Sequence, residues 1–144
     1  MSYIKVLIHY VWTTKDRIPY LKDPIRDSII THICTNAKQK GIYIDHINGS
    51  LEHLHALVSL GSQQTIAEIM HNIKGESSFW INKNKITPSK FQWQDDYYAV
   101  SIGMSHLFNL RRYIRNQGTH HAKVSLEGEL TKLIEEYKLE RFLD

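Results

Sequence analysis

Apolar side chains recur along this chain with two different periods, and each period predicts a different kind of element. β-branched and aromatic residues dominate residues 3–13, which predicts a first strand. Pro24 is well placed in a first helical turn, so a helix is expected from there to Gly41. The apolar stripe of this helix falls at four-residue steps, at Ile25, Ile29, Ile33 and Ala37.

Two further strands are expected over residues 42–47 and 53–60, joined around Asn48-Gly49, a pair that favours tight hairpin turns. Thr65 and Glu68 have the spacing of a capping box at the start of a helix. The remaining elements are, in order, this helix to about Ile81, a strand over 97–103, a helix over 106–117 and a last helix over 126–139.

This order of elements is that of the ferredoxin-like split βαβ fold, an α+β architecture, followed by a C-terminal helical extension that carries a candidate tyrosine. We therefore expect an antiparallel sheet with helices on one face and an opposite face left open for a ligand or a partner. Neither a repeat nor a linker interrupts the pattern, so residues 1–144 are expected to form a single domain. The fold alone does not define a function, because it hosts many.

Composition and charge narrow the class of protein. Apolar residues make up 42% and charged residues 23% of the chain, as in ordinary globular proteins. The apolar runs are too short to span a bilayer, so we expect a cytoplasmic protein without a membrane partner. The single cysteine, Cys34, excludes an internal disulfide. Net charge is only +3, but residues 111–123 carry basic side chains and no acid, a pattern that suits a polyanion or a solvated helix face.

A pair of histidines stands out within the apolar stretch LEHLHALVSL. Side chains of a strand alternate between its faces, so His53 and His55 are expected to share one face. Two imidazoles on a partly buried strand need polar partners, which a metal ion, carboxylates or water can supply. A metal held by so few ligands keeps positions open for water and substrate, which is typical of catalytic sites. Glu52 is expected on the opposite face, where it is a poor ligand, and His9 is expected to be a core or edge histidine.

A second candidate group lies in the helix expected over residues 106–117. Tyr113 and Gln117 are one helical turn apart, so a phenol and an amide oxygen can share one face. Basic residues flank the tyrosine, and they can bind phosphate and favour the phenolate. An amphipathic helix in which Tyr113 only covers a packing seam would have the same pattern.

Together these groups resemble the single-tyrosine HUH transposases of minimal bacterial insertion sequences, the IS-two-hundred-like group. The name HUH describes two histidines separated by a bulky hydrophobic residue, here His53-Leu54-His55, and the family's Tyr-x-x-x-Gln motif is matched by Tyr113 and Gln117. One departure is Asp95-Asp96-Tyr97-Tyr98, where the family often has a glycine-containing segment. Further matches, in chain order, are HYVWTTKDR from His9, NIKGESSFWIN from Asn72, FQWQ from Phe91 and YIRNQGTHHAK from Tyr113.

The resemblance implies a mechanism and a set of site residues. Tyr113 would attack a phosphate in single-stranded DNA and hold the 5′ end as a phosphotyrosine, leaving a free 3′-hydroxyl. His53, His55 and Gln117 would hold Mg²⁺ or Mn²⁺, which would polarise the phosphate. The family also implies hairpin ends on the DNA and a homodimer, in which the tyrosine helix of one subunit often completes the histidine site of the other. The basic residues expected to contact DNA are Lys15, Arg17, Lys74, Arg111, Arg112 and Arg115.

Two other functions are compatible with the sequence. A non-catalytic single-stranded nucleic-acid-binding module would use aromatic residues and the basic patch, and it would form no covalent adduct. A metal-dependent phosphodiesterase would activate water as its nucleophile, so Tyr113 would be structural and the DNA products would be released free.

Overall fold

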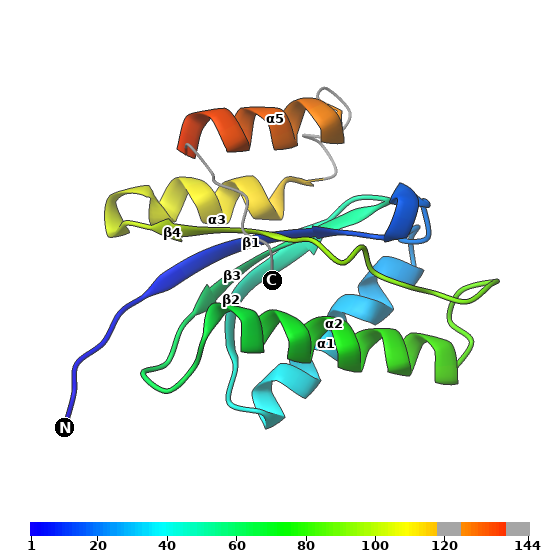
Figure 1. The fold of residues 1–144 in the computed structure, drawn as a ribbon, viewed down its shortest axis with the longest axis horizontal. Helices are drawn as coiled ribbons and strands as arrows, with labels where there is room; N and C mark the ends of the chain where they lie inside the picture. The colour runs from blue at the N-terminus through cyan, green and yellow to red at the C-terminus, as the bar shows by residue number, and fades with distance from the viewer. Residues whose placement is uncertain (118–124, 138–144) are drawn as a thin grey trace.

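The computed structural model describes residues 1–117 and 125–137, and its centre is a four-stranded antiparallel sheet (Figure 1). The spatial order of the strands is β2-β3-β1-β4. Together with two helices in the connections, this confirms the α+β split βαβ topology expected from the sequence. The strands are β1 (Leu7–Thr13), β2 (Tyr43–Gly49), β3 (His53–Ser59) and β4 (Tyr98–Ile102).

The first strand begins at Leu7 rather than at Tyr3, where the apolar pattern begins. Leu7 is also where pairing with both neighbours starts, opposite Ser59 of β3 and Ile102 of β4. Tyr3 lies before this pairing and remains 92% exposed in spite of its strand-forming neighbours. Strand propensity therefore extends the sheet only where a neighbouring strand is present to pair with.

Two helices cover one face of the sheet, as expected: α1 (Ile25–Gln39) and α2 (Ile66–Lys83) (Figure 1). The predicted apolar stripe of α1 packs into the core between these helices and the sheet. The hydroxyl of Thr65 accepts a hydrogen bond from the backbone N–H of Glu68 at 3.1 Å. This confirms Thr65 as the residue that caps α2.

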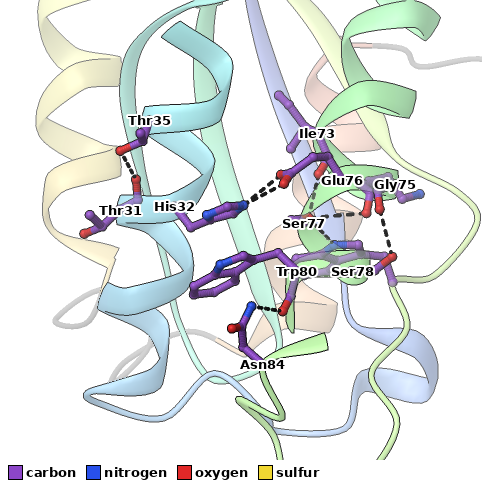
Figure 2. Close-up of polar contacts among 12 residues, drawn as sticks. Thr31, His32, Thr35, Ile73, Gly75, Glu76, Ser77, Ser78, Trp80 and Asn84 are labelled. Carbon is purple, nitrogen blue, oxygen red and sulfur yellow. Dashed lines mark hydrogen bonds and ion pairs between the residues drawn. The ribbon is translucent and has the colours of Figure 1, made fainter. Parts of the chain in front are cut away.

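A polar contact joins α1 to α2 on the side of the sheet away from the histidine pair (Figure 2). Nε2 of His32 lies 2.7 and 2.9 Å from the two carboxylate oxygens of Glu76. The His32 ring also stacks on Trp80, with ring centroids 4.1 Å apart. Trp12 and Trp93 are buried in the core beneath the sheet. This layer of α1 and α2 therefore contributes packing and stability on the face of the sheet opposite the histidines.

The opposite face of the sheet is covered, and the expectation of an open face was wrong. α3 (Leu107–Arg115) and α5 (Leu126–Tyr137) lie across it (Figure 1). Leu126 and Leu130 of α5 pack against apolar side chains of β1 and β4, and Ile114 of α3 packs against β1 and β3. The amphipathic C-terminal extension therefore buries its apolar side on this chain's own sheet.

The two C-terminal helices have different bounds from those the pattern predicts. A 3₁₀ turn (Met104–His106) precedes α3, which ends at Arg115, before the predicted end at Gln117. The last predicted helical residues, 138–139, lie outside the described residues. Within the part of the chain that the structure describes, no helix has the length and apolar character needed to cross a membrane.

The hairpin before β3 turns later than the Asn48-Gly49 pair predicts. β2 continues through Gly49, and residues 50–52 connect it to β3. A Cβ atom on Gly49 would lie 2.1 Å from the backbone oxygen of His53. Glycine is required there because the two strands approach closely, and this approach fixes the backbone of His53 against β2.

Candidate active site

The two histidines of β3 lie on the sheet face that α3 and α5 cover. They are two residues apart on one strand, so their side chains share this face, as expected. Both His53 and His55 have 0% of their surface exposed. Imidazoles buried to this extent need protein groups or a ligand at their ring nitrogens.

A polar group lies at Nδ1 of each histidine. Nδ1 of His53 is 2.9 Å from a carboxylate oxygen of Glu52, and Nδ1 of His55 is 2.9 Å from Nε2 of His9. Burial, together with the neighbouring His55, lowers the pKa of His9 to about 3, so this ring is neutral. The expectation that Glu52 points to the opposite face was wrong, because it lies in the turn before β3 and reaches the adjacent ring. These contacts lie at Nδ1 of both rings, so a shared ligand would bind at Nε2.

Tyr113 of α3 and Gln117, which follows the end of this helix, reach the same histidines. The side-chain oxygen of Gln117, which is fully buried, lies 3.2 Å from Nε2 of His53. The half-buried Tyr113 ring stands edge-on to His55, with ring centroids 5.4 Å apart and an angle of 85° between the planes. A single chain therefore brings the tyrosine motif and the histidine motif together.

An ion pair with β2 positions α3 over the sheet. The register between β2 and β3 shifts between Ile44 and His46, which makes Asp45 the extra residue of a β-bulge. Its carboxylate accepts two hydrogen bonds from the Arg111 guanidinium, at 2.9 and 2.7 Å, and this contact lowers the pKa of Asp45. Asn48 adds a hydrogen bond to the backbone oxygen of Arg115. These contacts hold both ends of the segment that carries the tyrosine.

Glu129 of α5 is a member of the site that the sequence interpretation missed. Its Oε1 lies 3.0 Å from Nε2 of His55, and its Oε2 lies 3.7 Å from Nε2 of His53. Burial raises the pKa of Glu129 to about 7, although His53 and His9 oppose the shift. The available signal was an acid between Leu126 and Leu130, on the apolar side of an amphipathic helix.

The basic residues expected to contact DNA lie in different surroundings. Lys15, Arg112 and Arg115 are exposed, so their side chains can reach a ligand in solution. Arg17 forms an ion pair with Glu127 of α5. DNA contacts by these residues stay predictions.

Lys74 is half-buried and binds the loop before β4. Its ammonium group donates hydrogen bonds to the backbone oxygens of residues 94–96, including one of 2.9 Å to Asp95. It also lies 5.9 Å from the centroid of the Tyr97 ring. In the described structure this lysine therefore holds the segment in which the chain departs from the glycine-containing pattern.

A hollow of about 440 Å³ opens beside the histidine site, at the end of β1. Thr13 lines it and lies directly opposite His53 in the pairing of β1 with β3. Leu130 contributes a wall from α5. The other lining residues are Trp12, Asp16, Arg17, Gln94, Asp96 and Tyr98.

The residues of the site fit a divalent metal ion. His53, His55 and Glu129 offer ligand atoms that all lie within 4.8 Å of one another, and all three residues are buried. Imidazole nitrogen, carboxylate oxygen and amide oxygen are common ligands of first-row divalent ions. The groups at Nδ1 of both histidines are of the kind that orient metal-binding imidazoles.

Loss of the Glu52 carboxylate is expected to weaken metal binding without preventing folding. In Glu52→Ala, the Nδ1 side of His53 loses its acceptor, so the ring is neither oriented nor made more basic. We expect the affinity for Mn²⁺ to fall by roughly 10–100-fold, as measured by calorimetry. Glu135→Ala, at an exposed position of α5, is the matched control and should bind as the wild type does. Equal affinity in the two variants would contradict an orienting role for Glu52.

Comparisons with known proteins identify the family. Residues 2–117 match the family model described as "Transposase IS200 like". A proposed transposase from Deinococcus radiodurans R1 has a similar structure, with a TM-score of 0.63 and 22% identity over 81% of this chain and 93% of that chain. A REP-associated tyrosine transposase, solved bound to a REP hairpin, gives a TM-score of 0.64 and 16% identity over 86% of this chain and 73% of that chain. No curated protein sequence matches significantly. The family match covers most of the chain, and the chain therefore belongs to the IS200-like transposase family.

Proposed function

We propose that this transposase cuts and rejoins single-stranded DNA through a covalent bond to Tyr113, with the assistance of a divalent metal ion. One observation carries the proposal: within a single chain of a transposase family, Tyr113 and Gln117 meet the buried pair His53 and His55. A nucleophile beside a metal-binding group is what phosphoryl transfer requires.

The chemistry exchanges one phosphodiester bond for another. The phenol oxygen of Tyr113 attacks the phosphorus, a Tyr–O–P bond forms, and the bond from phosphorus to the 3′ oxygen breaks. Over the whole reaction, the phenol proton is transferred to the departing 3′ oxygen, which becomes a free 3′-hydroxyl. A Mg²⁺ or Mn²⁺ ion held by His53, His55 and Gln117 would offset the negative charge that develops on the phosphate. The reverse attack by another 3′-hydroxyl joins strands and needs no nucleotide cofactor.

The proposed substrate is a single DNA strand with hairpin structure. The structural neighbour bound to a REP hairpin supports this substrate class. Arg112 and Arg115 are exposed near the tyrosine, and Lys15 is exposed close to the hollow, so they are the proposed backbone contacts. The hollow beside His53 has room for a nucleotide next to the phosphate that is cut. His53 and His55 are fully buried, so a phosphate would reach them only after groups that cover this face move.

The family also suggests how the protein assembles and where it acts. We expect a homodimer that acts in the cytoplasm, where its DNA substrate would be accessible. Each chain of the dimer would contain its own tyrosine and histidine motifs in contact. Light scattering of the purified protein tests this, and a monomeric mass would contradict the dimer.

A covalent-adduct assay tests the proposed function. Single strands from both flanks of the gene, labelled at the 3′ end, are incubated with protein and Mn²⁺ or Mg²⁺ and separated on a denaturing protein gel. We expect a labelled protein band that a chelator abolishes, because the 5′-phosphate end stays on the tyrosine. Metal-dependent cutting without a band would favour water as the nucleophile. Binding without cutting or a band would favour the non-catalytic module.

A further inference from the structure

Glu129 is a buried acid to which the proposed function assigns no role. It lies in the first turn of α5, on the side of the helix whose Leu126 and Leu130 pack on the sheet. Its side chain is only 4% exposed. Burying an acid among apolar neighbours is costly unless a specific partner compensates it.

The oxygens of Glu129 face both histidines at separations that suit a shared metal ion. They lie 3.0 Å from Nε2 of His55 and 3.7 Å from Nε2 of His53. The Gln117 oxygen lies 3.2 Å from the same nitrogen of His53. Ligand atoms around one ion, with bonds of about 2.1 Å, are separated by about 3.0 Å at right angles and about 3.4 Å in a tetrahedron. These three separations are therefore close to those of a ligand set, and the ligand atoms of His53, His55 and Glu129 all lie within 4.8 Å of one another.

The arrangement of the ring nitrogens and oxygens also suits a cation among these groups. The Glu52 carboxylate lies at Nδ1 of His53, so Nε2 is the nitrogen of this ring that could bind a metal ion. Nε2 faces the amide oxygen of Gln117 and a carboxylate oxygen of Glu129. Nitrogen and oxygen atoms placed in this way could bind one metal ion together.

Charge balance distinguishes Glu129 from the other three groups. The histidines and Gln117 are neutral ligands, so a divalent ion held by them alone would have no negatively charged ligand, and the Glu52 carboxylate lies only at the far nitrogen of His53. Burying an uncompensated charge is strongly unfavourable. A carboxylate from α5 supplies the negative charge that the HUH and Tyr-x-x-x-Gln motifs lack.

We propose that Glu129 is a fourth metal ligand, contributed by α5, which binds a divalent ion together with His53, His55 and Gln117 in the DNA-free protein. This inference rests on the metal site of the proposed function and adds a ligand from outside the two motifs. Two imidazoles, a carboxylate and an amide oxygen suit Mn²⁺ better than Mg²⁺, because Mg²⁺ prefers oxygen ligands only.

Titration of the DNA-free protein with Mn²⁺ tests this ligand directly, with the electron paramagnetic resonance signal of free Mn²⁺ as the readout. Glu129→Gln keeps the shape of the side chain and removes its charge, so we expect a folded protein with roughly tenfold or more weaker binding. Glu135→Gln removes the same charge from an exposed position of α5 and should bind normally. Glu129→Asp keeps the carboxylate and should bind more tightly than Glu129→Gln. If Glu129→Gln does not unfold cooperatively, and so is not properly folded, Glu129→Asp is compared with the wild type instead. We then expect Glu129→Asp to bind Mn²⁺ more weakly than the wild type.

The outcomes separate this inference from the proposed function. Wild-type affinity in Glu129→Gln, or in the Glu129→Asp comparison, alongside lost binding in His55→Phe would overturn the role of Glu129 and leave the histidine site intact. Equal weakening by Glu129→Gln and Glu135→Gln would reveal a general charge effect and would also overturn it. A wild-type protein that binds no Mn²⁺ would overturn both.

Discussion

Tyr113→Phe is expected to abolish the covalent protein–DNA adduct, with a loss on the order of a thousandfold or more in the rate of strand cleavage. The substitution removes only the phenol oxygen, which is the attacking atom in the proposed reaction. The ring remains and can keep its edge-on contact with His55, so the fold and the metal site are expected to persist. Adduct formation on a denaturing gel measures the effect, and Mn²⁺ titration checks that the metal site is unchanged.

Tyr43→Phe is a matched control for this prediction. Tyr43 lies on β2 and is 62% exposed, so loss of its hydroxyl should change neither cleavage nor adduct formation. Cleavage at the wild-type rate by Tyr113→Phe would contradict the nucleophile assignment and would favour a water-dependent phosphodiesterase.

Removing either histidine of β3 is expected to eliminate metal binding and, with it, metal-dependent cleavage. His53→Phe and His55→Phe keep a planar ring of similar size in the buried positions but remove both ring nitrogens. Loss of a direct ligand should weaken Mn²⁺ binding by more than the roughly 10–100-fold typical of an orienting group. The wild-type complex should also have a pulsed electron paramagnetic resonance spectrum with nitrogen coupling from imidazole, which each variant reduces.

His71→Phe provides the comparison for these variants. His71 is an exposed residue of α2, on the layer away from the site, so its loss should leave Mn²⁺ binding unchanged. Thermal unfolding of all three variants establishes that they are folded. Retained Mn²⁺ affinity in folded His53→Phe and His55→Phe would exclude these histidines as ligands.

The sequence pattern predicts the type and order of the elements because each depends on local periodicity. Thr65 caps its helix as the capping spacing predicts, and β3 begins at His53 as predicted. The first and last residues of each element were less predictable, because they depend on contacts with residues far away in the sequence. The strand pattern includes Tyr3, but the sheet begins only where β1 meets two neighbours. The pattern also could not predict that α3 and α5 cover the second face, since amphipathicity does not specify what a helix packs against.

The candidate site was predictable to the extent that it follows from regular spacing. His53 and His55 share a face because they are two residues apart on a strand, and Gln117 lies close to His53 although α3 ends before it. The supporting groups come from tertiary contacts. His9 meets His55 because β1 and β3 are adjacent, and Glu129 arrives only because α5 packs across the sheet.

In the proposed reaction Tyr113 itself becomes bonded to DNA, and this can be examined by identifying the residue to which the DNA is attached. The adduct formed with Mn²⁺ would be digested with nuclease and protease, and the modified peptide would be sequenced by mass spectrometry. We expect a nucleotide joined through its 5′-phosphate to Tyr113. Attachment to a different residue, or metal-dependent cutting that leaves no nucleotide on the protein, would contradict it.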